Sequence, residues 1–381
     1  MFERPAGGDG VILAQIDFGA GSFDDRLEEF RLLASSAGAR PLATVVGKRA
    51  RPDAAMFFGK GKAEELRSVA ESVDARLILV NHPLSPAQQR NLEQFCQRRV
   101  IDRSSLILDI FALRAQSHEG KLQVELAQLQ HLMTRLVRGW THLERQKGGI
   151  GLRGPGEKQL ETDRRLLGKR IAVLKSRLAK LHRQRGVRRK QRGRGEVLTV
   201  SLVGYTNAGK STLFNALTKA GVRCADQLFA TLDTTSRRMY TPACELADGG
   251  SGCQVVISDT VGFIRDLPHA LVAAFHATLE ETVEADLLLH VVDAASPDRE
   301  AQIDAVNAVL QEIGAVQPQI VVWNKIDRTA AAAGVERDDC ANICRVRASA
   351  RSGAGLDLLR AALAETAQRL TRPLETLDTA P

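Results

Sequence analysis

A chain of 381 residues is long enough for two or three domains that each bury a core of their own. Hydrophobic residues make up 44% and charged residues 26%, as in ordinary globular proteins, and the longest apolar runs are far shorter than the roughly 20 residues of a membrane span. The formal charge of +8 favours an anionic partner, and the first residues show no basic-then-apolar leader, so we expect a cytoplasmic protein without a membrane span.

Apolar strand-like runs alternate with helical ones through the first part of the chain. Strands are expected at 11–18, 41–47, 75–81 and 98–103, and helices at 22–38, 62–73 and 85–97. Strict alternation of this kind predicts parallel pairing with helices on the faces of the sheet. We therefore expect a small parallel α/β domain over residues 1–115, in which the stretch 59–62 is a basic turn before a helix or, as the alternative, a phosphate loop.

The next segment, residues 116–195, lacks strand signals and contains two short leucine-rich seams. Both seams have a 4-3-4-3 spacing, and they consist of Leu122, Leu126, Leu129, Met133 and Leu136, and of Leu167, Ile171, Leu174, Leu178 and Leu181. This spacing predicts an antiparallel helical hairpin packed through these residues. The intervening "GGIGLRGPGE" is too rich in glycine for a helix and predicts a flexible basic loop at the far end of the hairpin.

Basic residues dominate the second half of the hairpin segment, with no acidic residue between positions 164 and 195. The glycine-rich stretch and the basic tract 180–194 are either plain linkers or surfaces for an anionic polymer such as RNA. Neither has interleaved aromatic residues for base stacking, so contacts to phosphates are expected. The candidate RNA-contacting residues are Arg153, Lys158, Arg188, Arg189 and Lys190.

A third segment, residues 196–372, begins with an apolar strand that leads into the pattern GxxxxGKS. Gly204 and Gly209 let the loop curl so that its amides point at phosphate oxygens, and Lys210 is expected to reach the β- and γ-phosphates. The Ser211 hydroxyl is a candidate magnesium ligand, and the helix that starts here adds its positive dipole end. A strand before and a helix after are the context that such a phosphate-binding loop (P-loop) requires.

Later motifs in the same segment identify the nucleotide. In the DxxG motif, Asp259 is expected to hold magnesium through water, and the Gly262 amide is expected to bond the γ-phosphate. In "NKID", Asp327 can accept hydrogen bonds from guanine N1–H and the 2-amino group, which adenine does not offer, while Asn324 and Lys325 support the base and the loop. The later "ASARSG" would lie against the guanine edge. Four elements in this order predict a guanine-nucleotide site.

The first switch is expected between the P-loop and DxxG, in "LFATLDTTSRR". Thr231 is our candidate for the residue that completes the magnesium shell, with Thr234 and Thr235 as rivals. Lys210, Thr231 and Gly262 are the candidate catalytic residues. The full set of candidate nucleotide-binding residues is Gly204, Tyr205, Thr206, Asn207, Ala208, Gly209, Lys210, Ser211, Thr212, Phe229, Ala230, Thr231, Leu232, Asp233, Asp259, Thr260, Val261, Gly262, Asn324, Lys325, Ile326, Asp327, Ser349, Ala350 and Arg351.

Phe263 occupies the position after the DxxG glycine, where many GTPases carry a glutamine that orients the attacking water. A phenyl ring cannot orient water by hydrogen bonding, so the missing group must come from elsewhere. Asn207 offers one source, because some GTPases with asparagine at this P-loop position use it to hold a potassium ion that supplies positive charge near the phosphates.

With these motifs the chain resembles the HflX family of ribosome-associated GTPases along nearly its whole length. The resemblance is carried by "FFGKGKAEEL", "LILDIFALRAQSHEGKLQVELAQL", "GGIGLRGPGEKQLETDRR", "GYTNAGKST", "LFATLDTT", "DTVGFI" and "NKID". It implies an N-terminal α/β domain, a helical hairpin and a Ras-like P-loop G domain, with the hairpin loop directed toward the peptidyl-transferase region of the large ribosomal subunit. It also implies that an apolar residue at position 263 is the pattern of the family.

Together, the motifs and the resemblance predict a GTPase that is slow alone, is stimulated by the large ribosomal subunit, and splits or rescues stalled ribosomes under stress. The alternative is a slow-turnover, GTP-dependent factor for rRNA binding or ribosome assembly. We expect GTP, GDP and Mg²⁺ as ligands, with K⁺ open, and a monomer with a short C-terminal tail at 373–381.

Overall fold

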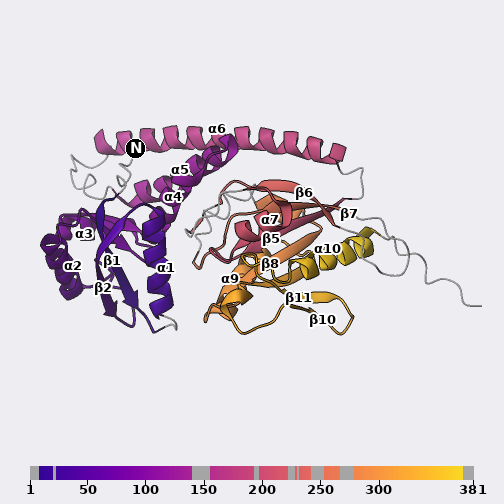
Figure 1. Ribbon diagram of the computed structural model, residues 1–381. Coiled ribbons are helices and arrows are strands. Elements are labelled where there is room, and N and C mark those ends of the chain that lie inside the picture. The colour runs from indigo at the N-terminus through magenta and orange to yellow at the C-terminus, as the bar shows by residue number, and fades with distance from the viewer. Residues whose placement is uncertain are drawn as a thin grey trace, which may run out of the picture. The chain divides into compact units, whose positions relative to one another are not determined.

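The computed structural model describes residues 8–19, 23–139, 155–192, 197–221, 228–229, 231–241, 253–266 and 279–371 (Figure 1). The chain divides into two compact units, one that extends from the first strand to Leu181 and one that contains the elements of the C-terminal half. Among the helices described, none combines the length and the apolar character that crossing a membrane would need.

The first unit contains a four-stranded, fully parallel sheet with the strand order β2-β1-β3-β4. Its elements are β1 (Gly10–Asp17), α1 (Phe23–Ser36), β2 (Arg40–Lys48), α2 (Lys60–Ser72), β3 (Leu77–Val80), α3 (Pro86–Cys96), β4 (Arg99–Asp102) and α4 (Arg103–Arg114). Six consecutive residues of β1 are buried, as expected for a strand that is covered on both faces. The predicted small parallel α/β fold is confirmed, and the stretch 59–62 lies at the start of α2.

Helix α4 has no counterpart among the elements expected from the sequence. It begins directly after β4, and the side chain of Asp102 caps it by accepting a hydrogen bond from the Ser105 amide at 2.9 Å. Apolar residues from several sides of the helix are buried, among them Ile107, Leu108 and Phe111. A helix buried nearly all round shows no amphipathic period, and this is why the sequence pattern did not indicate it.

Two helices follow, α5 (His118–Gly139) and α6 (Pro155–Arg192). The two seams pack together as predicted: Leu122, Leu126, Ile171, Leu174 and Leu178 form one buried cluster, with Leu129, Met133 and Leu181 against it. Arg170 of α6 also donates to Glu125 of α5 at 2.6 Å. The outermost seam residues, Leu136 and Leu167, lie outside this cluster.

The basic tract that follows the second seam belongs to α6, which continues without a break to Arg192. The tract is therefore helical as far as Arg192, and the linker and the RNA-surface interpretations of residues 180–194 both stay predictions. Residues 148–154 of the predicted glycine-rich loop, including Arg153, lie outside the described residues, as do the side chains of Lys158, Arg188, Arg189 and Lys190. The last three residues of that stretch, 155–157, form the start of α6, so the loop prediction is wrong for them.

The second unit is built on a seven-stranded sheet with the order β10-β11-β9-β8-β5-β7-β6. Its elements are β5 (Leu198–Gly204), α7 (Lys210–Thr218), β6 (Thr235–Thr241), β7 (Cys253–Asp259), β8 (Leu287–Asp293), α9 (Arg299–Glu312), β9 (Gln319–Asn324), the 3₁₀ turn η1 (Ile326–Arg328), β10 (Gly334–Arg337), β11 (Ile343–Arg347) and α10 (Leu356–Thr371). The five central strands are parallel, and the edge strands β6 and β10 are antiparallel to their neighbours. The predicted P-loop α/β architecture is confirmed.

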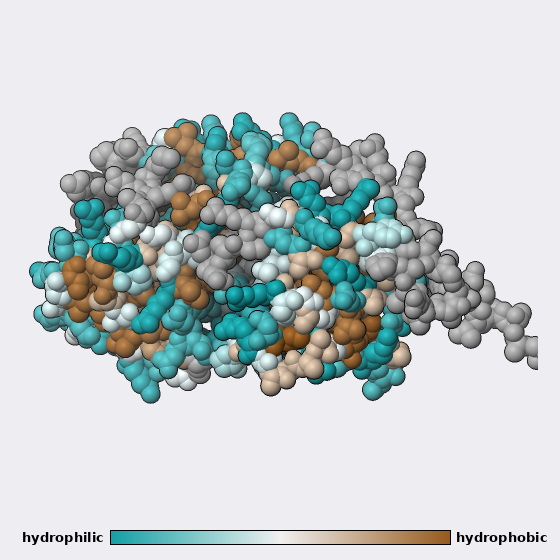
Figure 2. All heavy atoms as spheres, in the orientation of Figure 1, coloured by the Kyte–Doolittle hydropathy of each residue, from teal (hydrophilic) through white to brown (hydrophobic). Residues whose placement is uncertain are grey.

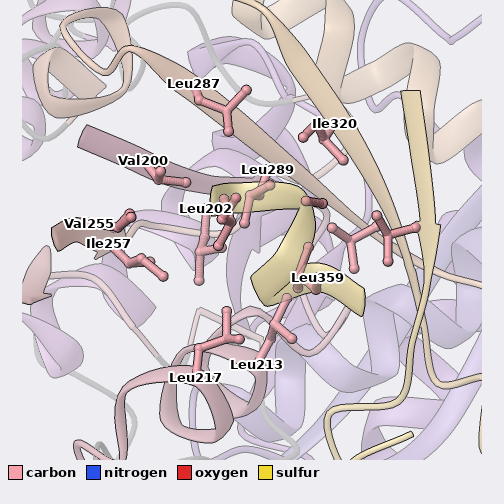
Figure 3. Close-up of a cluster of buried hydrophobic side chains, with 14 of the residues drawn as sticks. Val200, Leu202, Leu213, Leu217, Val255, Ile257, Leu287, Leu289, Ile320 and Leu359 are labelled. Carbon is pink, nitrogen blue, oxygen red and sulfur yellow. The ribbon is translucent and has the colours of Figure 1, made fainter. Parts of the chain in front are cut away.

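One face of this sheet packs against α7 and α10. Figure 3 shows Leu213 and Leu217 of α7 and Leu359 of α10 pointing toward strand residues that include Leu202 and Leu289. All five side chains are at most 5% exposed. This packing fixes α7 against β5, and thereby holds the loop between them in place.

The parallel strands determine where the sequence motifs meet. Strands β5, β7, β8 and β9 end at Gly204, Asp259, Asp293 and Asn324, and β11 leads into residues 348–353. Because the carboxyl ends of parallel strands lie at one edge of the sheet, these five positions come together there, which is the usual ligand-binding edge of such sheets.

Candidate nucleotide-binding site

The P-loop occupies residues 204–210, between β5 and α7. Gly204 has φ 149°, and a Cβ on it would lie 2.2 Å from the carbonyl oxygen of Val291 on β8. No side chain fits at this position, so glycine is required by both backbone conformation and space. The loop runs into the N-terminus of α7, where unpaired helix amides favour an anion.

The Lys210 side chain lies over this loop and is 6% exposed. Its Nζ donates to the carbonyl oxygens of Gly204 at 3.0 Å and Tyr205 at 2.8 Å. Burial lowers the pKa of Lys210 to about 8, and the negative charge of Asp259 opposes this shift. The ammonium is thus held at the mouth of the loop by neutral acceptors, in a place where phosphate oxygens would stabilise its charge.

Nucleotide affinity is expected to fall as the pH rises above the pKa of Lys210, which is about 8. Bound phosphates raise this pKa, so the complex retains a proton that the free protein has lost, and each pH unit in that range weakens binding by up to about tenfold. Titration of GDP binding across the range from about pH 7 to pH 9.5 would measure the slope. The Lys219→Asn variant, changed at an exposed lysine after α7, should keep the slope. A flat profile in the unaltered chain would contradict the role of Lys210.

Three oxygen-bearing side chains meet beside the P-loop at the end of β7. The hydroxyl of Ser211 donates to Asp259 Oδ2 at 2.7 Å, and the hydroxyl of Thr231 lies 2.7 Å from Ser211 Oγ and 3.2 Å from Asp259 Oδ2. Asp259 is fully buried, burial raises its pKa, and its Oδ1 has no hydrogen-bond partner among the described residues. Hydroxyl and carboxylate oxygens with a spare buried acceptor suit a magnesium ion, which prefers oxygen ligands.

Of the threonines proposed for the first switch, Thr231 is the one that reaches Ser211 and Asp259. Its rival Thr235 lies in β6, paired with Asp259 through the backbone of the sheet. The neighbouring candidate Ala230 lies outside the described residues, whereas Phe229 and Leu232 are buried at 2% and 3% exposure. Burial of these two side chains anchors the segment.

The DxxG segment lies directly on the P-loop. A Cβ on Gly262 would be 2.8 Å from Thr206 Cγ2 and 3.0 Å from Lys210 Nζ, so the backbone here approaches the Lys210 ammonium as closely as glycine allows. Phe263 forms a parallel bridge with the loop: its amide donates to Gly204 O at 3.1 Å, and its carbonyl accepts from Thr206 N at 2.7 Å.

The Phe263 side chain is buried, with 1% exposure. Its contribution here is therefore to packing and to the backbone bridge, and it brings no polar group to the site. The Thr260 hydroxyl donates to Leu202 O at 2.6 Å and fixes the other end of the segment.

The predicted base-binding motifs also interlock. The Ser349 hydroxyl donates to Asp327 Oδ1 at 2.5 Å, and the Ala350 amide donates to Asn324 Oδ1 at 3.0 Å. Asn324 Nδ2 in turn donates to Ala208 O at 2.9 Å, across to the P-loop. The Ser349 bond orients the Asp327 carboxylate, and Arg351 is exposed.

Sequence reasoning missed one residue of this arrangement. Asp293, the last residue of β8, pairs with Lys325 at 2.7 Å, and Lys325 Nζ also donates to Asn207 O at 2.7 Å. The signal was available, since an acidic residue ends the apolar run "LLLHVVD" at the edge where the other motifs lie. A second polar residue of β8, His290, is 2% exposed, and burial lowers its pKa to about 4, so it is neutral.

Comparisons with known proteins agree with this geometry. Residues 24–112 match the family described as GTP-binding GTPase N-terminal, residues 114–192 the GTP-binding GTPase middle region, and residues 199–325 the family described as 50S ribosome-binding GTPase. Among solved structures, the SsGBP–GDP complex covers 96% of this chain and 100% of its own at 23% identity with a TM-score of 0.50, a likeness of fold.

Two curated relatives share much more of the sequence. GTPase HflX of Escherichia coli (strain K12) is 55% identical over 96% of this chain and 84% of its own length. GTPase HflX of Magnetococcus marinus is 50% identical over 87% of this chain and 76% of its own length. Identity this high over most of both chains, together with a complete set of P-loop GTPase motifs at one sheet edge, shows that the chain is a GTPase and belongs to the HflX family.

Proposed function

We propose that this GTPase acts on the large ribosomal subunit, and that GTP binding and hydrolysis drive the splitting or rescue of stalled ribosomes. The observation that carries the proposal is the match of residues 199–325 to a family described as a 50S ribosome-binding GTPase. The basic helix α6 supports the proposal, because ribosomal RNA presents a dense array of phosphates.

The exposed surface of α6 has the charge that such a partner requires. Basic side chains are exposed along the helix, including Arg164, Arg165, Lys169, Lys175 and Arg177. Figure 2 shows hydrophilic side chains over the middle of α6, along the top of the view, with hydrophobic patches among them. We propose phosphate contacts along this helix, continued by Arg153, Lys158, Arg188, Arg189 and Lys190.

At the nucleotide site we propose the following roles. Lys210 and the P-loop amides hold the β- and γ-phosphates, Gly262 N–H bonds the γ-phosphate, and Asp327 reads the guanine edge. Ser211, Thr231 and, through water, Asp259 hold the magnesium ion that GTPases generally need, and this ion offsets phosphate charge when it is bound. Nucleotide contacts by the remaining candidates, from Tyr205 to Arg351, rest on their places in the four motifs and in the first-switch segment.

We also propose a potassium ion as a second cofactor. Asn207 has a left-handed backbone (φ 61°), its side chain is exposed, and its carbonyl is already engaged by Lys325. The side-chain oxygen is therefore the group that we propose as a potassium ligand.

We further propose a cytoplasmic monomer with domains at 1–115, 116–195 and 196–372, followed by a tail at 373–381. The family matches change over at 112/114 and at 192/199, close to the two internal limits, which supports those two boundaries.

Steady-state GTP hydrolysis by the purified chain, alone and with large ribosomal subunits, tests the proposal. We expect slow turnover alone and a stimulation of about 100-fold or more by the subunit, because buried Phe263 offers no group to orient water and ribosomal contacts must complete the site. Potassium buffers should give faster turnover than sodium buffers if Asn207 holds the ion. Tight GTP binding without any stimulation would contradict the ribosomal proposal.

A second function is favoured by the burial of Phe263. In the described DxxG segment, residues 259–266, no glutamine or histidine side chain is present to orient water, which suits a slow timer. Such a protein would act as a GTP-dependent factor in rRNA binding or subunit assembly, with occupancy as its output. Ribosome binding that persists unchanged with a nonhydrolysable GTP analogue, together with unstimulated hydrolysis, would favour this alternative.

A further inference from the structure

We propose that the β8–α9 loop, residues 293–298, is a brace that ties two nucleotide-sensing segments together through two carboxylates. Asp293 positions Lys325 of the NKxD motif, and Asp298 positions Arg265 beyond the DxxG motif. Both aspartates are positioning residues, since each acts through a basic side chain and neither is expected to touch the nucleotide. The inference rests on the nucleotide site proposed above.

The first arm of the brace starts at the end of β8. Asp293 Oδ2 accepts from Lys325 Nζ at 2.7 Å, while Asp293 Oδ1 accepts from the Ala295 amide at 3.0 Å and so fixes the carboxylate. Asp293 and Lys325 are 17% and 20% exposed. Lys325 has a left-handed backbone (φ 65°) and reaches across to Asn207 O. The lysine is therefore clamped between the brace and the P-loop, next to Asn324 and the base-reading Asp327.

The second arm reaches the DxxG segment. Asp298 lies at the N-terminus of α9, but its side chain makes no capping bond there and instead forms an ion pair with Arg265. The two side chains are 18% and 13% exposed, so the pair is largely withdrawn from solvent. The Arg265 amide also donates to the Tyr205 hydroxyl at 3.0 Å. Arg265 thus connects the P-loop, the DxxG segment and the brace.

The segment between these attachments carries the γ-phosphate contact. It is held at one end by the Thr260 hydroxyl on Leu202 O and at the other by Phe263 and Arg265. Gly262 lies between the two ends. The position of its amide depends on how rigid these attachments are. Loss of the Asp298 contact would therefore loosen the Gly262 amide, which contacts only the γ-phosphate.

Loss of each arm is predicted to change the affinities for GDP and for a GTP analogue in a different way. The Lys325 arm supports the base and the P-loop, which GDP and GTP share, so Asp293→Asn should weaken both nucleotides alike. The Arg265 arm supports Gly262, which only GTP reaches, so Asp298→Asn should weaken a GTP analogue and leave GDP unchanged. A merely structural loop would give equal losses for both substitutions.

The test measures dissociation constants of Mg²⁺–GDP and of a Mg²⁺-bound nonhydrolysable GTP analogue, together with kcat and KM, for the full chain and four variants. We expect Asp293→Asn to weaken both nucleotides by about tenfold and Asp298→Asn to weaken the analogue by about tenfold with GDP unchanged. Asp357→Asn serves as the matched control, since Asp357 is 97% exposed and pairs with Arg360 on α10. The exchange of Arg265→Asp with Asp298→Arg should restore part of the analogue affinity.

The possible results distinguish a failure of the brace from a failure of the nucleotide site on which it rests. An unaltered chain that binds neither nucleotide would refute the nucleotide site. An unaltered chain that binds both, with Asp293→Asn and Asp298→Asn variants indistinguishable from it, would refute the brace alone. Equal losses of GDP and analogue in the Asp298→Asn variant, or a lowered Tm that accounts for the losses, would assign the loop a purely structural role.

Discussion

Replacement of Asp327 by asparagine is expected to lower the affinity for GTP by about 10³-fold. The carboxylate can accept hydrogen bonds from both guanine N1–H and the guanine 2-amino group. The asparagine amide has one acceptor and one donor, so one of these two guanine donors would face another donor. The effect should be large because the carboxylate is held rigidly: Ser349 Oγ donates to Oδ1 at 2.5 Å, and Asn324 and Ala350 lock the adjoining loops together. The same substitution should admit xanthosine triphosphate, whose 2-oxo group accepts from the new amide.

Competition of GTP and xanthosine triphosphate for the Asp327→Asn variant, followed by hydrolysis of each, measures this change. Asp304→Asn is a suitable control, because this aspartate is exposed on α9 and lies in none of the motifs. A variant that kept its preference for GTP would show that Asp327 does not read the base.

Replacement of Lys210 by alanine is expected to weaken GDP and GTP by about 100-fold or more, through loss of a buried ammonium that makes charge-assisted bonds to phosphate. In the structure this ammonium bonds only neutral carbonyl oxygens of Gly204 and Tyr205 among the contacts described, and burial lowers its pKa to about 8. A buried cation with weak partners gains much from an anion, so its removal costs binding more than it costs folding.

Equilibrium binding of both nucleotides, with thermal unfolding in parallel, tests this expectation. Lys219→Asn removes a lysine from the exposed end of the same helix and keeps a residue that tolerates the left-handed backbone there (φ 55°), so its affinity should not change. Unchanged affinity in the Lys210→Ala variant would reject the site as described.

The sequence by itself determined the parts of this protein that depend on local patterns. Glycines and Lys210 at fixed spacing define the P-loop, because backbone curvature and the helix N-terminus arise within a few residues. The leucine seams determined the α5–α6 packing in the same way, since residues three and four apart share a helix face. The guanine-reading role that we propose for Asp327 also rests on the motif and its chemistry.

Only the tertiary structure decided the features that depend on distant residues. Asp293 meets Lys325, and Asp298 meets Arg265, because parallel strands bring the ends of separate segments to one edge. Helix α4 was not predicted from the sequence, because it is buried on several sides and therefore shows no amphipathic period. The orientation of the Phe263 side chain could likewise not be predicted from the sequence, since a phenyl ring beside a P-loop can face the ligand or the core. Packing of the DxxG segment against the P-loop buries it, and that contact exists only once β5 and β7 have paired.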